Sequence, residues 1–203
     1  MPMKAEREYR RIDVRNLETR EEENGKMIVE GYATTFNQEY CLFEEGDFRF
    51  MESVDAAAFD GCDMSDVIMQ YDHAGRVFAR TGNGTLVVKP DEHGLHIAAD
   101  LGGTDLGRQL YQEIKGGYTN RMSFGFTVAR DEETEKEDAG GTTHHRKIMQ
   151  FKKLYDVSAV SIPANDYTEI SARGLNDGAI RKALEDYQER RRKLKIIKIL
   201  TEV

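Results

Sequence analysis

Short apolar runs separated by tight-turn residues dominate the chain between residues 24 and 101. The turn signals are Asn24-Gly25, Gly82–Gly84 and Pro90–Gly94, because these residue types adopt the backbone angles that tight turns require. The strands expected on either side of these turns are residues 26–36, 77–81, 85–89 and 95–101. Consecutive strands joined by such short turns pair antiparallel. The pattern therefore predicts an α+β fold with a mainly antiparallel β-barrel or sandwich core and a few flanking helices.

Two segments carry helix signals. Residues 53–60 contain an alanine run behind Ser53, a residue type that caps helix N-termini, and they predict a short helix. Residues 104–114 place their apolar side chains on one stripe behind Thr104 and Asp105, either of which can serve as the cap. A glycine pair then ends this second helix.

The last third of the chain is more strongly charged. Residues 131–143 are acidic and contain glycine, which predicts an exposed, mobile loop. His144-His145 would point to opposite faces of the following strand, so we interpret them as a solvated pair and not as metal ligands. Residues 176–200 predict an amphipathic helix that extends past the core, either as a partner-binding arm or as a solvated surface helix. We expect three parts: a charged N-terminal strand region at 1–25, a main domain at 26–172 and a C-terminal charged helix at 173–203.

Composition restricts the possible partners. The 203 residues carry a formal net charge of -8, which argues against a nucleic-acid partner. No apolar run approaches the roughly 20 residues that span a bilayer, and the first residues lack the apolar core of a secretory signal. We therefore expect an intracellular protein with no membrane partner. Cys41 and Cys62 form no CxxC pair, which predicts free thiols and no zinc site.

One predicted strand, residues 121–126, places a small hydroxyl among large apolar side chains. In a pleated strand the methionine and both phenylalanines share one face, while Ser123 and Gly125 share the other. The aromatic face can then sit on a core, and the serine face stays open. Such a position suits a nucleophile, but serines on exposed strand faces are usually ordinary surface residues.

A histidine and a carboxylate accompany that serine on other predicted strands. His73 ends the apolar run at 67–71, and Asp156 lies within the apolar and hydroxyl-rich run 154–162. A hydroxyl, an imidazole and a group that orients the imidazole are the requirements of serine protease chemistry. The chain contains no G-x-S-x-G, H-E-x-x-H or phosphate-binding glycine loop. From residue types alone, a plain all-β binding domain ranks above a catalytic triad.

A series of local motifs resembles the prohead proteases of tailed phages, serine peptidases of capsid maturation whose fold is related to the herpesvirus assembly protease. These motifs occur in the family's order and cover roughly residues 26 to 170. They are Glu30-Gly-Tyr-Ala33, Phe36-Asn37, Ala57-Ala-Phe-Asp60, His73 after an apolar strand, Gly84-Thr-Leu86, Gly94-Leu95, Met122-Ser-Phe-Gly-Phe126, Leu154-Tyr-Asp-Val-Ser158 and Pro163-Ala-Asn165.

The resemblance implies a role for each member of the constellation. His73 resembles the general base, Ser123 the nucleophile, and Asp156 the acidic member, where many relatives have Glu. Asp72 is an alternative partner for the imidazole. The strand that ends at His73 should then lie beside residues 121–126.

Two further points concern the same region. Ser158 and Ser161 are rival serines, which we interpret as hydroxyls that satisfy local strand hydrogen bonds. Arg121 or backbone amides near Ser123 could stabilise the oxyanion.

The resemblance implies a serine endopeptidase without a cofactor. It would cleave scaffold segments, capsid-protein precursor segments and its own chain, as a homo-oligomer in the host cytoplasm and the assembling prohead of a phage or prophage. The alternative is a non-catalytic assembly factor of the same fold that binds capsid protein through its C-terminal helix. A third hypothesis is a generic intracellular hydrolase with the same fold.

Overall fold

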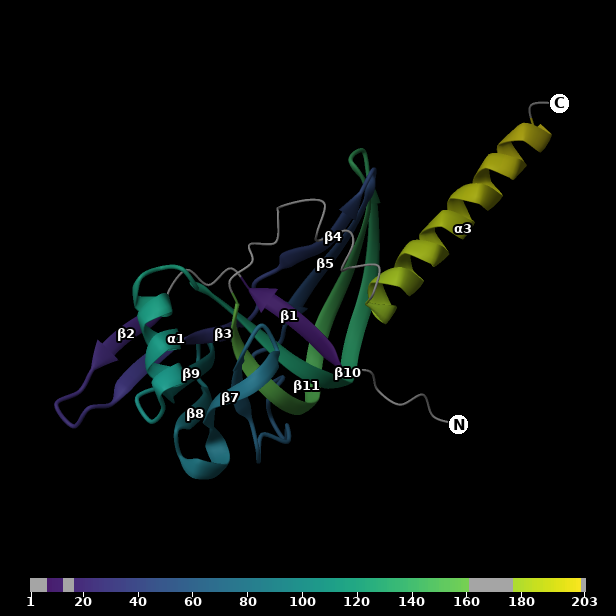
Figure 1. Cartoon of the computed structure of the whole chain (residues 1–203). Helices are drawn as coiled ribbons and strands as arrows, with labels where there is room; N and C mark the ends of the chain where they lie inside the picture. The colour runs from purple at the N-terminus through teal and green to yellow at the C-terminus, as the bar shows by residue number, and fades with distance from the viewer. Residues whose placement is uncertain (1–6, 13–16, 161–176, 202–203) are drawn as a thin grey trace. The chain divides into compact units, whose positions relative to one another are not determined.

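The computed structural model describes residues 7–12, 17–160 and 177–201 (Figure 1). In chain order the elements are β1 (Glu8–Ile12), β2 (Glu18–Glu21), β3 (Met27–Thr35), β4 (Tyr40–Glu45), β5 (Phe48–Val54), β6 (Ile68–Tyr71), β7 (Ala74–Arg80), the 3-10 helix η1 (Thr81–Asn83), β8 (Leu86–Pro90), β9 (Gly94–Asp100), α1 (Asp105–Lys115), β10 (Arg121–Asp138), β11 (Gly141–Val160) and α3 (Gly178–Thr201).

These elements form two compact units. Unit 1 comprises Met1–Gln38, Val54–Asp131 and Ile148–Ile162, and unit 2 comprises Glu39–Ser53, Glu132–Lys147 and Pro163–Val203. The long strands β10 and β11 contribute residues to both units. The sequence-based division at residues 25 and 172 stays a prediction.

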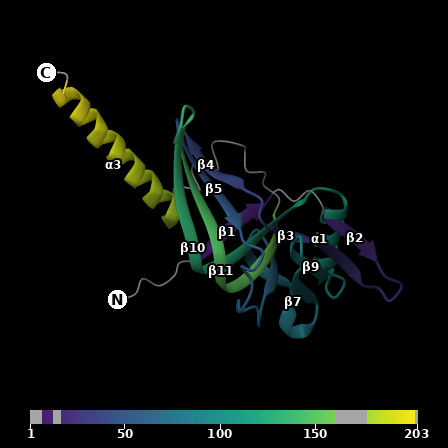
Figure 2. The same cartoon turned by 180° about the vertical axis from the view of Figure 1, so that it is seen from behind.

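Unit 1 contains two open sheets (Figures 1 and 2). In one, β1 pairs with β10, β10 with β11, β11 with β6, and β6 with β7. In the other, the order is β2-β3-β9-β8. The expected α+β class with a mainly antiparallel sandwich is confirmed, and the described strands do not close into a barrel.

Two of the expected hairpins are present. The Asn24-Gly25 turn joins β2 to β3, and Gly25 has a φ of 84° that favours glycine. The turn after Pro90 joins β8 to β9, because the Asp91 side chain accepts hydrogen bonds from the amides of His93 and Gly94.

The hairpin expected between residues 77–81 and 85–89 is wrong. β7 pairs with β6, and β8 pairs with β9 in the other sheet, so η1 carries the chain from one sheet to the other. The chain does turn at these glycines, but a turn does not determine the partner of each strand that flanks it. The Thr81 amide donates to the Val67 carbonyl and keeps this end of β7 beside β6.

The helix expected at 53–60 is also wrong. Ser53 belongs to β5, and the chain then makes successive turns. The Asp55 side chain accepts the Ala57 amide at 3.0 Å, which favours a turn over a helix here. The helix expected behind Thr104 is confirmed as α1, where the threonine hydroxyl accepts the Gly107 amide.

The mobile loop expected at 131–143 is wrong as well. β10 continues to Asp138, and the chain turns before β11 begins at Gly141. Acidic side chains here are exposed, but their backbone runs in a strand. Polarity predicted the exposure correctly and says nothing about main-chain pairing.

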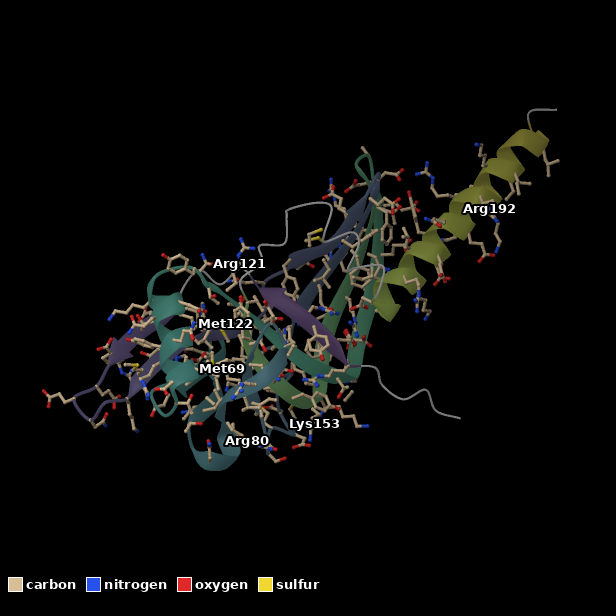
Figure 3. All side chains as sticks on the ribbon, viewed as in Figure 1. Met69, Arg80, Arg121, Met122, Lys153 and Arg192 are labelled. Carbon is tan, nitrogen blue, oxygen red and sulfur yellow. The ribbon has the colours of Figure 1, made fainter. Side chains whose placement is uncertain are left out.

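Aromatic packing forms the core of unit 1. Phe126 lies with its ring centroid 4.8 Å from those of Phe124 and Phe151. Met69 and Met122, labelled in Figure 3, are fully buried in the same cluster. The smaller sheet contributes its own apolar face, including Val29 and Ile97, and this joint burial holds the two sheets together.

Unit 2 has a separate apolar cluster between β4, β5 and the first turns of α3. Its buried members are Phe43, Phe48, Phe50, Ile180, Ala183, Leu184 and Tyr187. The expected helix is therefore confirmed, and its first turns bury an apolar side. His144 is 9% exposed and stacks on Phe50 at 4.9 Å, so the expectation of a solvated pair is wrong for this histidine. Neither described helix is long and apolar enough to cross a lipid bilayer.

We expect Phe124→Ala to lower the free energy of unfolding by about 3–5 kcal/mol, because it leaves a cavity in the aromatic core. Tyr118→Ala is the matched control, since this aromatic is 80% exposed and its loss should change stability by less than about 0.5 kcal/mol. Urea denaturation measures both. Equal effects of the two substitutions would contradict the assignment of the core.

Candidate active site

Ser123 lies in β10 on the face opposite the buried aromatics, as expected. It is nevertheless only 2% exposed, so the expectation of an open face is wrong. Its neighbours include β1, which pairs antiparallel with β10 and aligns Arg11 with Ser123, and the imidazole of His73. Gly125 is required beside it, because a β-carbon there would collide with Asp156 and come within 2.8 Å of the Tyr9 ring.

His73 occupies a two-residue turn between β6 and β7. The turn is formed by Asp72 and His73, whose φ angles are 48° and 57°. Positive φ at both central residues suits the right-handed twist of a hairpin but is unfavourable for residues other than glycine. The Asp72 amide donates to the Ala159 carbonyl at 3.0 Å and ties the turn to β11. A strained turn that is fixed by neighbouring strands is typical of functional sites.

Asp156 lies in β11 with its side chain fully buried. Its Oδ1 atom accepts a hydrogen bond of 2.9 Å from the Ser158 hydroxyl, and its Oδ2 atom pairs with the guanidinium of Arg7. The requirement for partners around a buried carboxylate is thus met. Ser158, one of the rival serines, acts here as a hydrogen-bond donor, and Ser161 lies outside the described residues.

The structure brings His73, Ser123 and Asp156 together. His73 Nδ1 lies 2.5 Å from Asp156 Oδ1, and His73 Nε2 lies 2.5 Å from Ser123 Oγ. The imidazole therefore links a hydroxyl to a carboxylate. Such an arrangement can accept the hydroxyl proton at Nε2 while the carboxylate orients the ring through Nδ1.

The strands that carry these residues are arranged differently from the expectation. β6, which leads to His73, does not lie beside β10, because β11 lies between them. β6 pairs parallel with β11, with Ile68 opposite Asp156. The turn after β6 then places the imidazole between the side chains of β10 and β11.

Burial raises the pKa of Asp156, but the hydrogen bond from His73, the charges of His73 and Arg7, and the Ser158 hydroxyl outweigh it and leave the pKa below its ordinary value. The fold thus favours the ionised carboxylate. This is the form that holds an imidazolium in place.

Three N-terminal groups also contact the site, and no sequence pattern indicated them. Arg7 pairs with Asp156, and the Tyr9 ring packs edge-on against His73 with centroids 4.5 Å apart. The Ser123 hydroxyl donates to the backbone carbonyl of Arg10 at 2.9 Å. The charged N-terminal region was expected to contain a strand, but nothing in its sequence identified β10 as the partner. Among the described residues, no group of three or more His, Cys, Asp or Glu could hold a metal ion.

The Asp156 carboxylate should stabilise the fold in a pH-dependent way. Since its pKa is lowered by folding, its contribution is present above its ordinary pKa of 3.8 and is lost as the pH falls through the folded value. We expect Asp156→Asn to lower the free energy of unfolding by about 1–3 kcal/mol at neutral pH. This difference from the natural protein, measured by urea denaturation, should shrink below about pH 4. A constant difference would contradict the assignment.

No curated protein and no solved structure that was compared matches the chain. A family model does: that of the caudovirus prohead serine protease matches residues 15–197. The match includes all three residues of the site and nearly the whole chain. The resemblance noted in the motifs is confirmed, and the protein belongs to the caudovirus prohead serine protease family.

Proposed function

We propose that the chain is the endopeptidase of prohead maturation and that His73, Ser123 and Asp156 are its catalytic triad. The observation that carries this proposal is the imidazole held at 2.5 Å from a hydroxyl on one side and a carboxylate on the other. Membership of the prohead serine protease family supports the same chemistry.

The proposed reaction proceeds through an acyl-enzyme. Ser123 Oγ attacks the carbonyl carbon of the scissile peptide bond and passes its proton to His73 Nε2, which then protonates the leaving amine. Water repeats the sequence on the resulting ester, with His73 again taking the proton. Asp156 holds Nδ1 and stabilises the imidazolium. Arg121, two residues before Ser123, or backbone amides of β10 would stabilise the oxyanion.

The substrates we propose are scaffold segments and capsid-protein precursor segments, together with the protease's own chain. The protease would act as a homo-oligomer in the host cytoplasm and within the assembling prohead. No cofactor is required for this reaction.

Ser123→Ala should abolish cleavage of co-expressed capsid and scaffold proteins, because no hydroxyl remains to form the ester. Asp156→Asn should reduce the rate by about 10⁴-fold, the size of this effect in other Ser-His-Asp enzymes. Ser65→Ala, in an exposed turn, is the control and should leave the rate unchanged. Mass spectrometry of new protein termini gives the readout and also reports self-cleavage. Cleavage that survives Ser123→Ala would refute the proposal.

The alternative function, capsid-protein binding without catalysis, is favoured by the exposed apolar residues of α3. Leu194, Ile197 and Leu200 follow one another at a spacing of three residues, are 62%, 56% and 72% exposed, and lie beyond the part of α3 that packs in unit 2. Exposed apolar residues near one another on a helix are typical of an interaction site.

We expect replacement of these three α3 residues by glutamine to reduce incorporation into procapsids at least about tenfold while peptidase activity persists, because only the binding surface is changed. Gln188→Ala on the same helix is the control. Quantitative mass spectrometry of purified procapsids measures incorporation. Incorporation at the natural level would contradict a role of α3 in binding capsid protein. Absence of peptidase activity from the full-length protein under assembly conditions would favour the binding function alone.

A further inference from the structure

The N-terminal strand β1 covers the candidate active site. We propose that β1 occupies, in the resting protein, the edge of β10 at which the substrate binds, and that it must leave before Ser123 can react. The substrate would then be an extended peptide that pairs with β10 in place of β1. This inference rests on the proposed function. It adds that the substrate binds as an extended strand and that the resting protein is closed by β1.

The N-terminal segment contacts each member of the triad. Arg7 pairs with the Asp156 carboxylate, Tyr9 packs its ring on the His73 imidazole, and the Arg10 carbonyl accepts the Ser123 hydroxyl. These are the groups that a reacting peptide would have to approach. β1 and the residue directly before it therefore contact all of them.

The first consequence is steric. A scissile carbonyl must come within about 3–3.5 Å of the nucleophilic oxygen. In the structure the Arg10 carbonyl oxygen lies 2.9 Å from Ser123 Oγ, and Ser123 is 2% exposed. The space that a substrate carbonyl needs is thus taken by a carbonyl of the protein itself.

The second consequence concerns the proton. A serine hydroxyl has one hydrogen to donate. Both the Arg10 carbonyl and His73 Nε2 lie at hydrogen-bond distance from it, at 2.9 and 2.5 Å. A hydroxyl that donates to the Arg10 carbonyl does not donate to Nε2. β1 therefore directs the hydroxyl hydrogen away from the imidazole, to which catalysis must transfer it.

The third consequence concerns charge. The Asp156 carboxylate should stabilise the imidazolium that forms during the reaction. The Arg7 guanidinium on its second oxygen offsets that negative charge. Arg7 is itself held in place, because it lies over the rings of Tyr9 and Tyr155 at 5.1 and 4.5 Å. Departure of β1 would leave the full carboxylate charge to His73.

β1 is also the element of this sheet best suited to leave. It is five residues long and lies at the sheet edge, and among the described strands it pairs only with β10. Tyr9 is 45% exposed, and the Arg7 side chain is 36% exposed. The buried Arg10 side chain, over the Phe126 ring at 5.5 Å, holds the strand in its resting position. Short edge strands with exposed side chains separate at low free-energy cost.

The test uses the full chain and a fluorophosphonate that labels reactive serines. Arg7→Gln/Tyr9→Ala should be labelled at Ser123 about fivefold faster than the natural protein, because an ion pair and an aromatic contact that hold β1 are lost. The matched control is Arg20→Gln/Tyr32→Ala in the other sheet, where Arg20 pairs with Glu30 and Tyr32 packs edge-on against His93 at 4.7 Å. The control should be labelled at the natural rate.

A synthetic peptide with the sequence of residues 7–12, Arg-Glu-Tyr-Arg-Arg-Ile, should return the labelling of the first variant to the natural rate. A scrambled peptide should not. Labelling of that variant at or below the natural rate, or acceleration by the peptide, would overturn the inference, because β1 would then be a working part of the site. Absence of Ser123 labelling in every protein would instead refute the proposed function.

A second measurement does not depend on any variant. A diphenyl phosphonate built on the sequence of residues 7–10 carries an extended peptide to Ser123 of the natural protein. Once Ser123 is modified, the backbone amides of residues 7–12 should exchange with deuterium about tenfold faster or more, since β1 has been displaced. If these amides stay equally protected from exchange when Ser123 is fully modified, the inference is overturned. The proposed function would still stand in that case, because Ser123 would have reacted.

Discussion

The buried carboxylate of Asp156 is the constraint on which the site depends. A charge without contact to water must be surrounded by hydrogen-bond donors and opposite charges, or the fold would favour its neutral form. Here the donors come from distant parts of the chain: His73 from the turn after β6, Ser158 from β11 itself, and Arg7 from the N-terminal segment. The carboxylate therefore fixes the imidazole, and the imidazole in turn fixes its position against Ser123.

The opposite face of the same strands explains why this arrangement is rigid. β10 presents Phe124 and Phe126 to the core of unit 1, where they pack with Phe151 from β11. A slip of one residue between β10 and β11 would turn these aromatics toward the site and Ser123 into the core, at the loss of most of the buried apolar surface. The register that the core requires is thus the register that brings serine and carboxylate together.

Much of this was predictable from local patterns, and the remainder was not for identifiable reasons. Alternation over residues 121–126 predicted the strand and its buried face, and Thr104 predicted the start of α1. The wrong pairing of β7, the wrong helix at 53–60 and the wrong loop at 131–143 concern pairing and turn geometry, which depend on distant partners or on one side chain such as Asp55. The contacts of residues 7–12 with the site have the same origin, since Arg7 and Asp156 lie 149 residues apart.

Burial has two opposing effects on a site of this kind. Exclusion of water strengthens the interactions of the carboxylate with the imidazole, which a proton transfer requires. The same exclusion keeps a protein substrate from reaching the hydroxyl. A permanently open site would admit water and weaken the interaction between carboxylate and imidazole. A permanently closed site would exclude the protein substrate. A removable strand at the edge of β10 satisfies both requirements, because an incoming peptide would replace the backbone of β1 by its own and keep water out while the bond is cleaved.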